Sequence, residues 1–271
     1  MSLFQALLLG ILQGATEFLP VSSSGHLVLV PWLLRWQDPG LTFDAIVHWA
    51  TAFAVLAYFW RDWLDLVRAS WEAVRSRSLA STQARLALFI IIGSVPGALA
   101  GVLLEDFFEH AFSRPPIAAA LLLVTAGLLT ASEKLSSQDK ALEDLQWVDS
   151  LLIGGAQAMA ILPGISRSGA TIATGILTGL RREAAARFSF LLATPIILGA
   201  GLFKLLELIE MGGLAAQAPT LLVGALAALL TGLACIHFLL RYLRRRPLYP
   251  FAVYCATAGV IFLIIAVIRG S

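Results

Sequence analysis

Residues 13–26 read QGATEFLPVSSSGH, and they interrupt an apolar region that covers residues 1–34. A related stretch, LPGISRSGAT at residues 162–171, interrupts a second apolar region at residues 148–180. The arms on either side of each break are shorter than the roughly 20 apolar residues that cross a bilayer. Irregular backbone at membrane depth is tolerated only where protein or a water-filled cavity surrounds it. We therefore predict two re-entrant helical hairpins whose breaks face an internal cavity.

The composition of the chain is that of a membrane protein. Hydrophobic residues make up 59% of the 271 residues and charged residues only 13%, whereas soluble domains carry about 25% charged residues. The small net charge of +2 argues against a nucleic-acid partner. Residues 1–34 contain no Lys or Arg, so we do not expect a signal peptide. The cysteines form no CxxC or Cys/His pattern, which argues against a zinc site.

Six further apolar stretches are long enough to cross a membrane. They lie at residues 43–63, 83–104, 116–133, 184–209, 218–240 and 249–268. We therefore predict an all-α integral membrane protein that forms a single membrane domain over residues 1–271, with six transmembrane helices plus two re-entrant helical hairpins.

The two interrupted regions are related by one constant shift along the chain. Repeat one is expected at residues 1–133 and repeat two at residues 148–271, each with one hairpin and three spans. Because three is odd, the second repeat must be inverted relative to the first. Inverted-topology repeats place their binding site at the repeat interface near the membrane midplane. The residues that coincide are Gln13 with Gln157, Ser22 with Ser166, Ser24 with Ser168, and Gly25 with Gly169.

Clusters of arginine predict the orientation of the chain. They lie in a loop expected at residues 61–85, at residues 181–187 and at residues 241–246. By the positive-inside rule, these three regions are cytoplasmic. Both termini are then external, and the first hairpin enters from outside. The stretch 105–114 is expected outside because it is acidic, with Glu105, Asp106 and Glu109.

The first break carries the residues Glu17 and His26. Gln13 and Glu17 are four apart and share one face of a helix. A carboxylate at membrane depth is expensive and marks a functional site, where it can hold a divalent cation or take a proton from water. His26 can act as acid, base or nucleophile near neutral pH. The alternative is an interfacial first helix with Glu17 in water.

The second break has the character of an anion site. A Gly- and Ser-rich turn that opens a helix presents free N–H groups to a negative charge. Arg167 adds a planar fork suited to phosphate oxygens. At membrane depth this arginine must find an anion, either a substrate or Glu17. A buried Glu17–Arg167 pair that only locks the hairpins together is the structural alternative. Further hydroxyl donors are Ser166, Ser168 and Thr171.

Other residues in the spans are interpreted as structural. Asp44 and His48 stand four apart at the start of the first span, where they could support a site or cap the membrane entry, and we favour the second interpretation. Gly93, Gly97 and Gly101 form a stripe that is typical of close helix packing or of a homodimer.

The stretch QGATEFLPVSSSGH resembles the first motif of the bacterial undecaprenyl-diphosphate phosphatases of the bacitracin-resistance type. LPGISRSGAT resembles their second motif, PGxSRSxxT, and the layout is similar over the whole chain. Position 13 is Glu or Gln in this family. Because this chain has the amide at Gln13, the resemblance assigns the role of metal ligand or base mainly to Glu17.

The resemblance implies hydrolysis of undecaprenyl diphosphate to undecaprenyl phosphate and inorganic phosphate in the bacterial inner (plasma) membrane. That reaction recycles the lipid carrier of peptidoglycan and cell-wall synthesis and gives bacitracin resistance. The partners would be the polyprenyl diphosphate and membrane lipids, and the cofactor a divalent cation, magnesium or calcium. The active site would open to the periplasmic or external face.

The expected site divides into three groups. Candidate catalytic residues are Glu17, Ser23, His26 and Arg167. Candidate diphosphate-binding residues are Ser22, Ser24, Ser166, Arg167, Ser168 and Thr171. Candidate cation ligands are Glu17 and Gln13. The nucleophile stays open between water, His26, and Ser23 activated by His26 or Glu17. The alternative function is a polyprenyl-phosphate flippase that uses the same anion site, with Glu17 and His26 as a proton relay.

Overall fold

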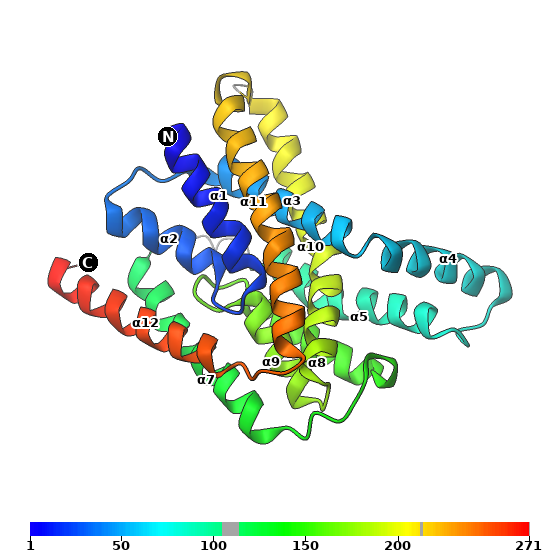
Figure 1. The fold of residues 1–271 in the computed structure, drawn as a ribbon. Coiled ribbons are helices and arrows are strands. Elements are labelled where there is room, and N and C mark those ends of the chain that lie inside the picture. The colour runs from blue at the N-terminus through cyan, green and yellow to red at the C-terminus, as the bar shows by residue number, and fades with distance from the viewer. Residues whose placement is uncertain (105–113, 212–213, 271) are drawn as a thin grey trace.

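The computed structural model describes residues 1–104, 114–211 and 214–270, and its regular elements are helices (Figure 1). The acidic stretch with Glu105, Asp106 and Glu109 lies outside these residues. The all-α prediction is confirmed. The helices are α1 (Leu3–Phe18), α2 (Ser23–Leu34), α3 (Gly40–Tyr58), α4 (Trp60–Ser76), α5 (Thr82–Leu103), α7 (Pro115–Leu135), a 3-10 turn (Leu142–Asp144), α8 (Trp147–Met159), α9 (Arg167–Leu177), α10 (Arg182–Met211), α11 (Leu214–Leu243) and α12 (Tyr249–Arg269).

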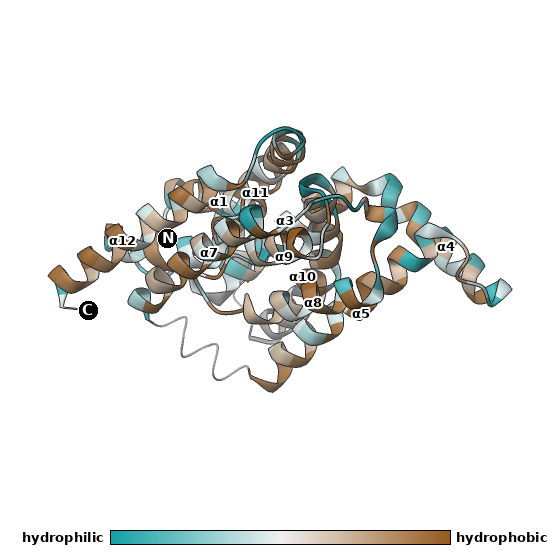
Figure 2. Cartoon of the chain, turned by 90° about the horizontal axis from the view of Figure 1, so that it is seen from below, coloured by the Kyte–Doolittle hydropathy of each residue, from teal (hydrophilic) through white to brown (hydrophobic). Residues whose placement is uncertain are grey.

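Five helices are long and apolar enough to cross a membrane, namely α5, α7, α10, α11 and α12. They coincide with five of the six predicted spans. Figure 2 shows hydrophobic residues along α5 and α12, which lie toward opposite ends of the molecule in that view. The chain is therefore a multi-pass membrane protein.

The sixth predicted span, residues 43–63, is not one straight helix. α3 ends at Tyr58, and the chain bends by 77° into α4. The loop predicted at residues 61–85 is also wrong, because α4 fills much of it. α4 buries Leu66 and Ala69 and leaves its arginines exposed. A helix with one narrow apolar stripe resembles a charged loop in composition. Only the regular spacing of its apolar residues distinguishes the two.

Both interrupted regions form a helix, a break and a second helix. Ser22 caps α2, and its Oγ accepts from the N–H of Gly25 at 3.2 Å. Ser166 caps α9 in the same way, and its Oγ accepts from the N–H of Gly169 at 3.0 Å. Serine is a preferred N-cap because its oxygen satisfies a first-turn N–H. These caps therefore fix where the second helix of each pair begins.

Each helix before a break packs against a helix from the other half of the chain. A Cβ on Gly10 of α1 would lie 2.3 Å from the carbonyl oxygen of Gly224 in α11. A Cβ on Gly154 of α8 would lie 2.2 Å from the carbonyl oxygen of Gly93 in α5. Such close backbone approach requires glycine. The third helices of the two halves, α7 and α12, also pack on each other.

The glycine stripe of α5 serves packing inside the chain. Gly93 meets Ser150 and Leu192, and a Cβ on Gly97 would lie 2.8 Å from Ile196. Gly101 has nothing within 4 Å. The expectation of close helix packing is confirmed at two of the three positions, and the homodimer stays a prediction.

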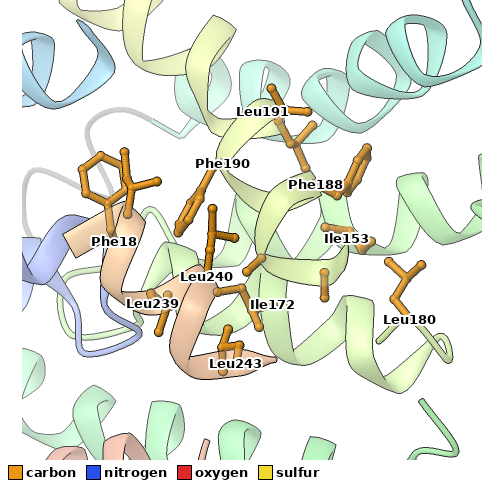
Figure 3. Close-up of a cluster of buried hydrophobic side chains, with 14 of the residues drawn as sticks. Phe18, Ile153, Ile172, Leu180, Phe188, Phe190, Leu191, Leu239, Leu240 and Leu243 are labelled. Carbon is orange, nitrogen blue, oxygen red and sulfur yellow. The ribbon is translucent and has the colours of Figure 1, made fainter. Parts of the chain in front are cut away.

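A buried apolar cluster underlies the two breaks (Figure 3). The rings of Phe18 and Phe190 meet edge to face, with centroids 5.3 Å apart and planes at 87°. Phe18 directly follows Glu17, and Ile172 of the same cluster directly follows Thr171. The cluster therefore fixes the helix turns that carry the polar residues.

The three arginine-rich regions gather on one side of the fold. Arg187 of α10 pairs with Asp62 of α4, and Arg244, just beyond α11, pairs with Glu183 of α10 at 2.7 Å. The starts of α4 and α10 and the end of α11 therefore lie together, as their common charge predicts.

Candidate functional site

Glu17 is the centre of the polar site between the two breaks. It is buried, with 5% of its surface exposed. Its Oε1 pairs with Nη2 of Arg167, and its Oε2 accepts a hydrogen bond from Ser23 Oγ. Gln13 donates to Oε2 at 3.1 Å, across one helical turn of α1. One carboxylate thus joins both interrupted regions.

Arg167 has a second nitrogen that the pair with Glu17 does not use. Its Nη1 is buried and has no hydrogen-bond partner among the described residues. A buried donor without an acceptor is destabilising, and for a charged group the cost is larger. A pair that only locked the helices together would account for Nη2 but not for Nη1. The free donor therefore favours a site for an anionic ligand.

The starts of α2 and α9 lie side by side. Ser168 Oγ donates to the carbonyl oxygen of Leu19 at 3.1 Å. A Cβ on Gly25 would lie 3.1 Å from the Cα of Gly164, whose φ of +98° favours glycine. The first N–H groups of a helix have no partner inside it, and the helix dipole adds positive potential there. Ser23 and Arg167, at these two helix starts, both contact Glu17, so the two helix ends lie close to the same carboxylate.

The serines predicted to bind phosphate line these two helix starts. Ser22 and Ser24 have their hydroxyl oxygens 3.4 Å apart, and Ser166 and Ser168 have theirs 3.2 Å apart. The serine pairs that the repeat relates therefore have the same local arrangement, each at the start of its own helix.

Thr171 has a different environment from the serines. Its hydroxyl lies 2.7 Å from the carbonyl oxygen of Arg167, to which it donates, and 2.6 Å from Ser189 Oγ. Because its proton is used within the helix, Thr171 holds the turn that carries Arg167.

His26 points away from the Glu17 carboxylate. Its Nδ1 lies 2.7 Å from the carbonyl oxygen of Ser22, and its Nε2 lies 2.7 Å from the hydroxyl of Tyr254. Both ring nitrogens are therefore engaged away from Ser23. Of the two activating partners considered for Ser23, the structure brings Glu17 to it.

His48 is a neighbour of the site. Its Nε2 lies 3.8 Å from Glu17 Oε2, so the structure favours the supporting role in a site over the membrane-entry interpretation that we preferred from the sequence. Its Nδ1 lies 2.7 Å from the carbonyl oxygen of Asp44. The sequence signal for this role is that Asp44 and His48 are two titratable residues, one helical turn apart, inside an apolar span.

Thr125 and Tyr254 also adjoin the site without a sequence signal for that role. Thr125 Oγ1 donates to the carbonyl oxygen of Gly164 at 3.0 Å and accepts from the N–H of Ser166 at 3.0 Å. It therefore holds the second break in place. Both residues are far from the motifs in sequence, and only the fold brings them there.

A divalent cation has limited protein ligands at this site. No group of three or more His, Cys, Asp or Glu residues that could hold a metal occurs in residues 1–104, 114–211 and 214–270. Gln13 Oε1 is buried and has no partner in the same part of the chain. Magnesium is commonly held by one or two carboxylates together with substrate phosphates. Glu17 and Gln13 therefore fit a cation that phosphate oxygens also coordinate.

The fold and the site together define a multi-pass, all-helical membrane protein with an internal polar site suited to an anion. Residues 6–261 match the model of the family described as bacitracin resistance protein BacA, and the chain belongs to this family.

Curated relatives cover the chain almost completely. Undecaprenyl-diphosphatase of Desulforudis audaxviator (strain MP104C) is 43% identical over 270 residues, which are 100% of both chains. Undecaprenyl-diphosphatase of Moorella thermoacetica (strain ATCC 39073 / JCM 9320) is 46% identical over 256 residues, with 94% of each chain covered. Undecaprenyl-diphosphatase of Syntrophotalea carbinolica (strain DSM 2380 / NBRC 103641 / GraBd1) is 46% identical over 267 residues, which are 98% of this chain and 100% of the relative.

Proposed function

We propose that this chain hydrolyses undecaprenyl diphosphate to undecaprenyl phosphate and inorganic phosphate, and thereby gives resistance to bacitracin. Its family and its full-length relatives support this activity. The observation in the structure that carries it is the buried Nη1 of Arg167, which has no partner among the described residues. Arg167 itself opens α9, and one pair of serines lies at the start of α2 and another at the start of α9.

Arg167 and the two helix starts bind the diphosphate. The guanidinium fork and the first-turn N–H groups neutralise charge on the phosphate oxygens, and the serine hydroxyls add neutral donors. In phosphoryl transfer, positioning and charge neutralisation supply most of the catalysis. The prenyl tail stays among the lipid-facing helices.

Ser23 is the nucleophile in the mechanism that the geometry supports best. Its Oγ attacks the terminal phosphorus, and its proton passes to Glu17 Oε2, which already accepts a hydrogen bond from it. The bond between phosphorus and the bridging oxygen breaks, and undecaprenyl phosphate leaves. Water then hydrolyses the phosphoserine and releases inorganic phosphate. His26 supplies or removes a proton in one of these steps.

We propose that Glu17 and Gln13 would hold a magnesium or calcium ion. When bound, such a cation would supply charge neutralisation for the phosphate oxygens. The unpartnered Oε1 of Gln13 supports this assignment.

An inverted-topology repeat with two re-entrant hairpins explains the packing. α1 packs on α11 while α8 packs on α5, so that the hairpin of each half lies against the middle span of the other. With the arginine-rich side in the cytoplasm, the site opens to the external face of the inner membrane. That face is where a diphosphate carrier is left when its sugar cargo is transferred.

Phosphate release from undecaprenyl diphosphate by the purified protein in detergent tests this proposal. Release should require magnesium or calcium and should fall at least about 100-fold in Arg167→Ala, since removing an anion-stabilising group costs this much. The matched control Arg75→Ala, in an exposed position of α4, should retain full activity. No release by a folded protein that still binds the lipid would favour the flippase.

A further inference from the structure

His26 is held in one tautomer by its own helix. It is buried, with 2% of its surface exposed. A carbonyl oxygen only accepts hydrogen bonds, so the contact of 2.7 Å between Nδ1 and the carbonyl oxygen of Ser22 places a proton on Nδ1. In the neutral ring, Nε2 then carries a lone pair and must accept.

Tyr254 supplies the partner for that lone pair from the opposite end of the chain. Its hydroxyl lies 2.7 Å from Nε2. The two ring planes are within 14° of parallel, with centroids 5.7 Å apart, so the rings also stack on each other. The hydroxyl therefore donates to neutral His26, and it can turn to accept when Nε2 is protonated.

Tyr254 is the partner of the one ring nitrogen of His26 that the backbone does not engage. Its side chain lies on α12, and 47% of its surface is exposed. Its hydroxyl occupies the only site on the His26 ring that can gain or lose a proton, because Nδ1 is engaged with the backbone. A proton that enters or leaves His26 through Nε2 must therefore pass the Tyr254 hydroxyl.

We infer that Tyr254 is a positioning residue for the reaction, which holds the His26 ring through Nε2 and exchanges a proton with that nitrogen. The inference rests on the proposed catalytic role of His26. It places part of the catalytic machinery on α12, which neither motif contains.

Tyr254→Phe tests the inference because it removes only the hydroxyl. We expect kcat for phosphate release to fall roughly 10-fold or more with KM within about twofold, the pattern of a lost acid–base partner rather than lost binding. In ¹⁵N-histidine-labelled protein, the Nε2 signal of His26, assigned with His26→Gln, should shift to that of an unbonded nitrogen. Tyr249→Phe, earlier on the same helix, is the matched control and should change neither quantity.

A double-variant cycle separates action through His26 from a structural effect. In the His26→Gln background, Tyr254→Phe should lower kcat by less than about twofold, since residues that act as a unit are not additive. An equal loss in both backgrounds would overturn the inference, as would wild-type kcat and an unchanged Nε2 signal in the single variant. Wild-type kcat in His26→Gln would instead remove the catalytic role of His26, and this inference with it.

Discussion

At the scale of the residue, the charge of Glu17 is shared among partners from three helices. Arg167 of α9, Ser23 of α2 and Gln13 of α1 all contact its carboxylate. Each partner therefore has its own role in the proposed reaction, and single substitutions distinguish these roles through their effects on kcat and KM.

Ser23→Ala should abolish the chemical step while leaving binding intact. The substitution removes the hydroxyl that contacts Glu17, so kcat should fall at least about 100-fold with KM little changed. Ser70→Ala is the control, since Ser70 donates only to a carbonyl of its own helix. Steady-state phosphate release measures both constants. A Ser23→Ala protein with more than a tenth of wild-type kcat would leave water as the nucleophile.

His48→Gln should weaken catalysis more mildly. The imidazole Nε2 of His48 lies 3.8 Å from Glu17 Oε2. An amide at this place removes that ring from the neighbourhood of the carboxylate, so kcat/KM should fall by roughly 10-fold. His237→Gln removes a histidine that contacts Tyr58 elsewhere and should have no effect. Equal kcat/KM in the two variants would show that His48 is structural.

Much of the site could be predicted from the two motifs, because their residues are close in sequence to the breaks that present them. Glu17 was one of the two anions considered for Arg167, beside a substrate, and the structure shows this pair. The orientation of His26 toward Tyr254 could not be predicted, because it depends on how α12 packs in three dimensions. A pattern within one segment contains no information about such a distant partner.

At the scale of the element, glycine determines how closely the helices approach. Gly154 and Gly155 are neighbours in α8, but only Gly154 faces α5, and nothing lies within 4 Å of a Cβ on Gly155. The two residues therefore form a natural pair for comparison.

Gly154→Ala should destabilise the protein by about 1–3 kcal/mol through overpacking. Gly155→Ala should be neutral or stabilising by up to about 1 kcal/mol, because alanine has the higher helix propensity. Thermal unfolding of the two variants in the same detergent checks the difference. Equal melting temperatures would contradict the close contact between α8 and α5.

The long apolar helices could be predicted because hydropathy over about 20 residues is a strong signal. The bend after α3 and the helix α4 could not, since α4 is too polar for a span and its apolar stripe is narrow. To predict an amphipathic helix between two spans, the spacing of the apolar residues must be considered as well as the composition.

At the scale of the whole molecule, helices from one half of the chain pack on helices from the other half. α1 packs on α11 and α8 packs on α5, and both breaks meet at Glu17 and Arg167. The molecule therefore needs both halves to complete one site.

The proposed orientation can be measured by labelling single cysteines in intact cells. With Cys235 and Cys255 replaced by alanine, a cysteine at Ser78, beyond α4 on the arginine-rich side, should be inaccessible to an impermeant maleimide. A cysteine at Ser2 should be labelled, because the positive-inside rule places the N-terminus outside. The reverse pattern would place the site on the cytoplasmic face.

The most direct test of a single site built from both halves is a cycle of phosphate-release measurements on the wild type, Glu17→Ala, Arg167→Ala and the double variant. If the pair acts as one unit, each single variant should lose at least about 100-fold in kcat/KM. The kcat/KM of the double variant should then be no lower than that of the less active single variant. Losses that multiply, or a single variant with full activity, would contradict one shared catalytic site.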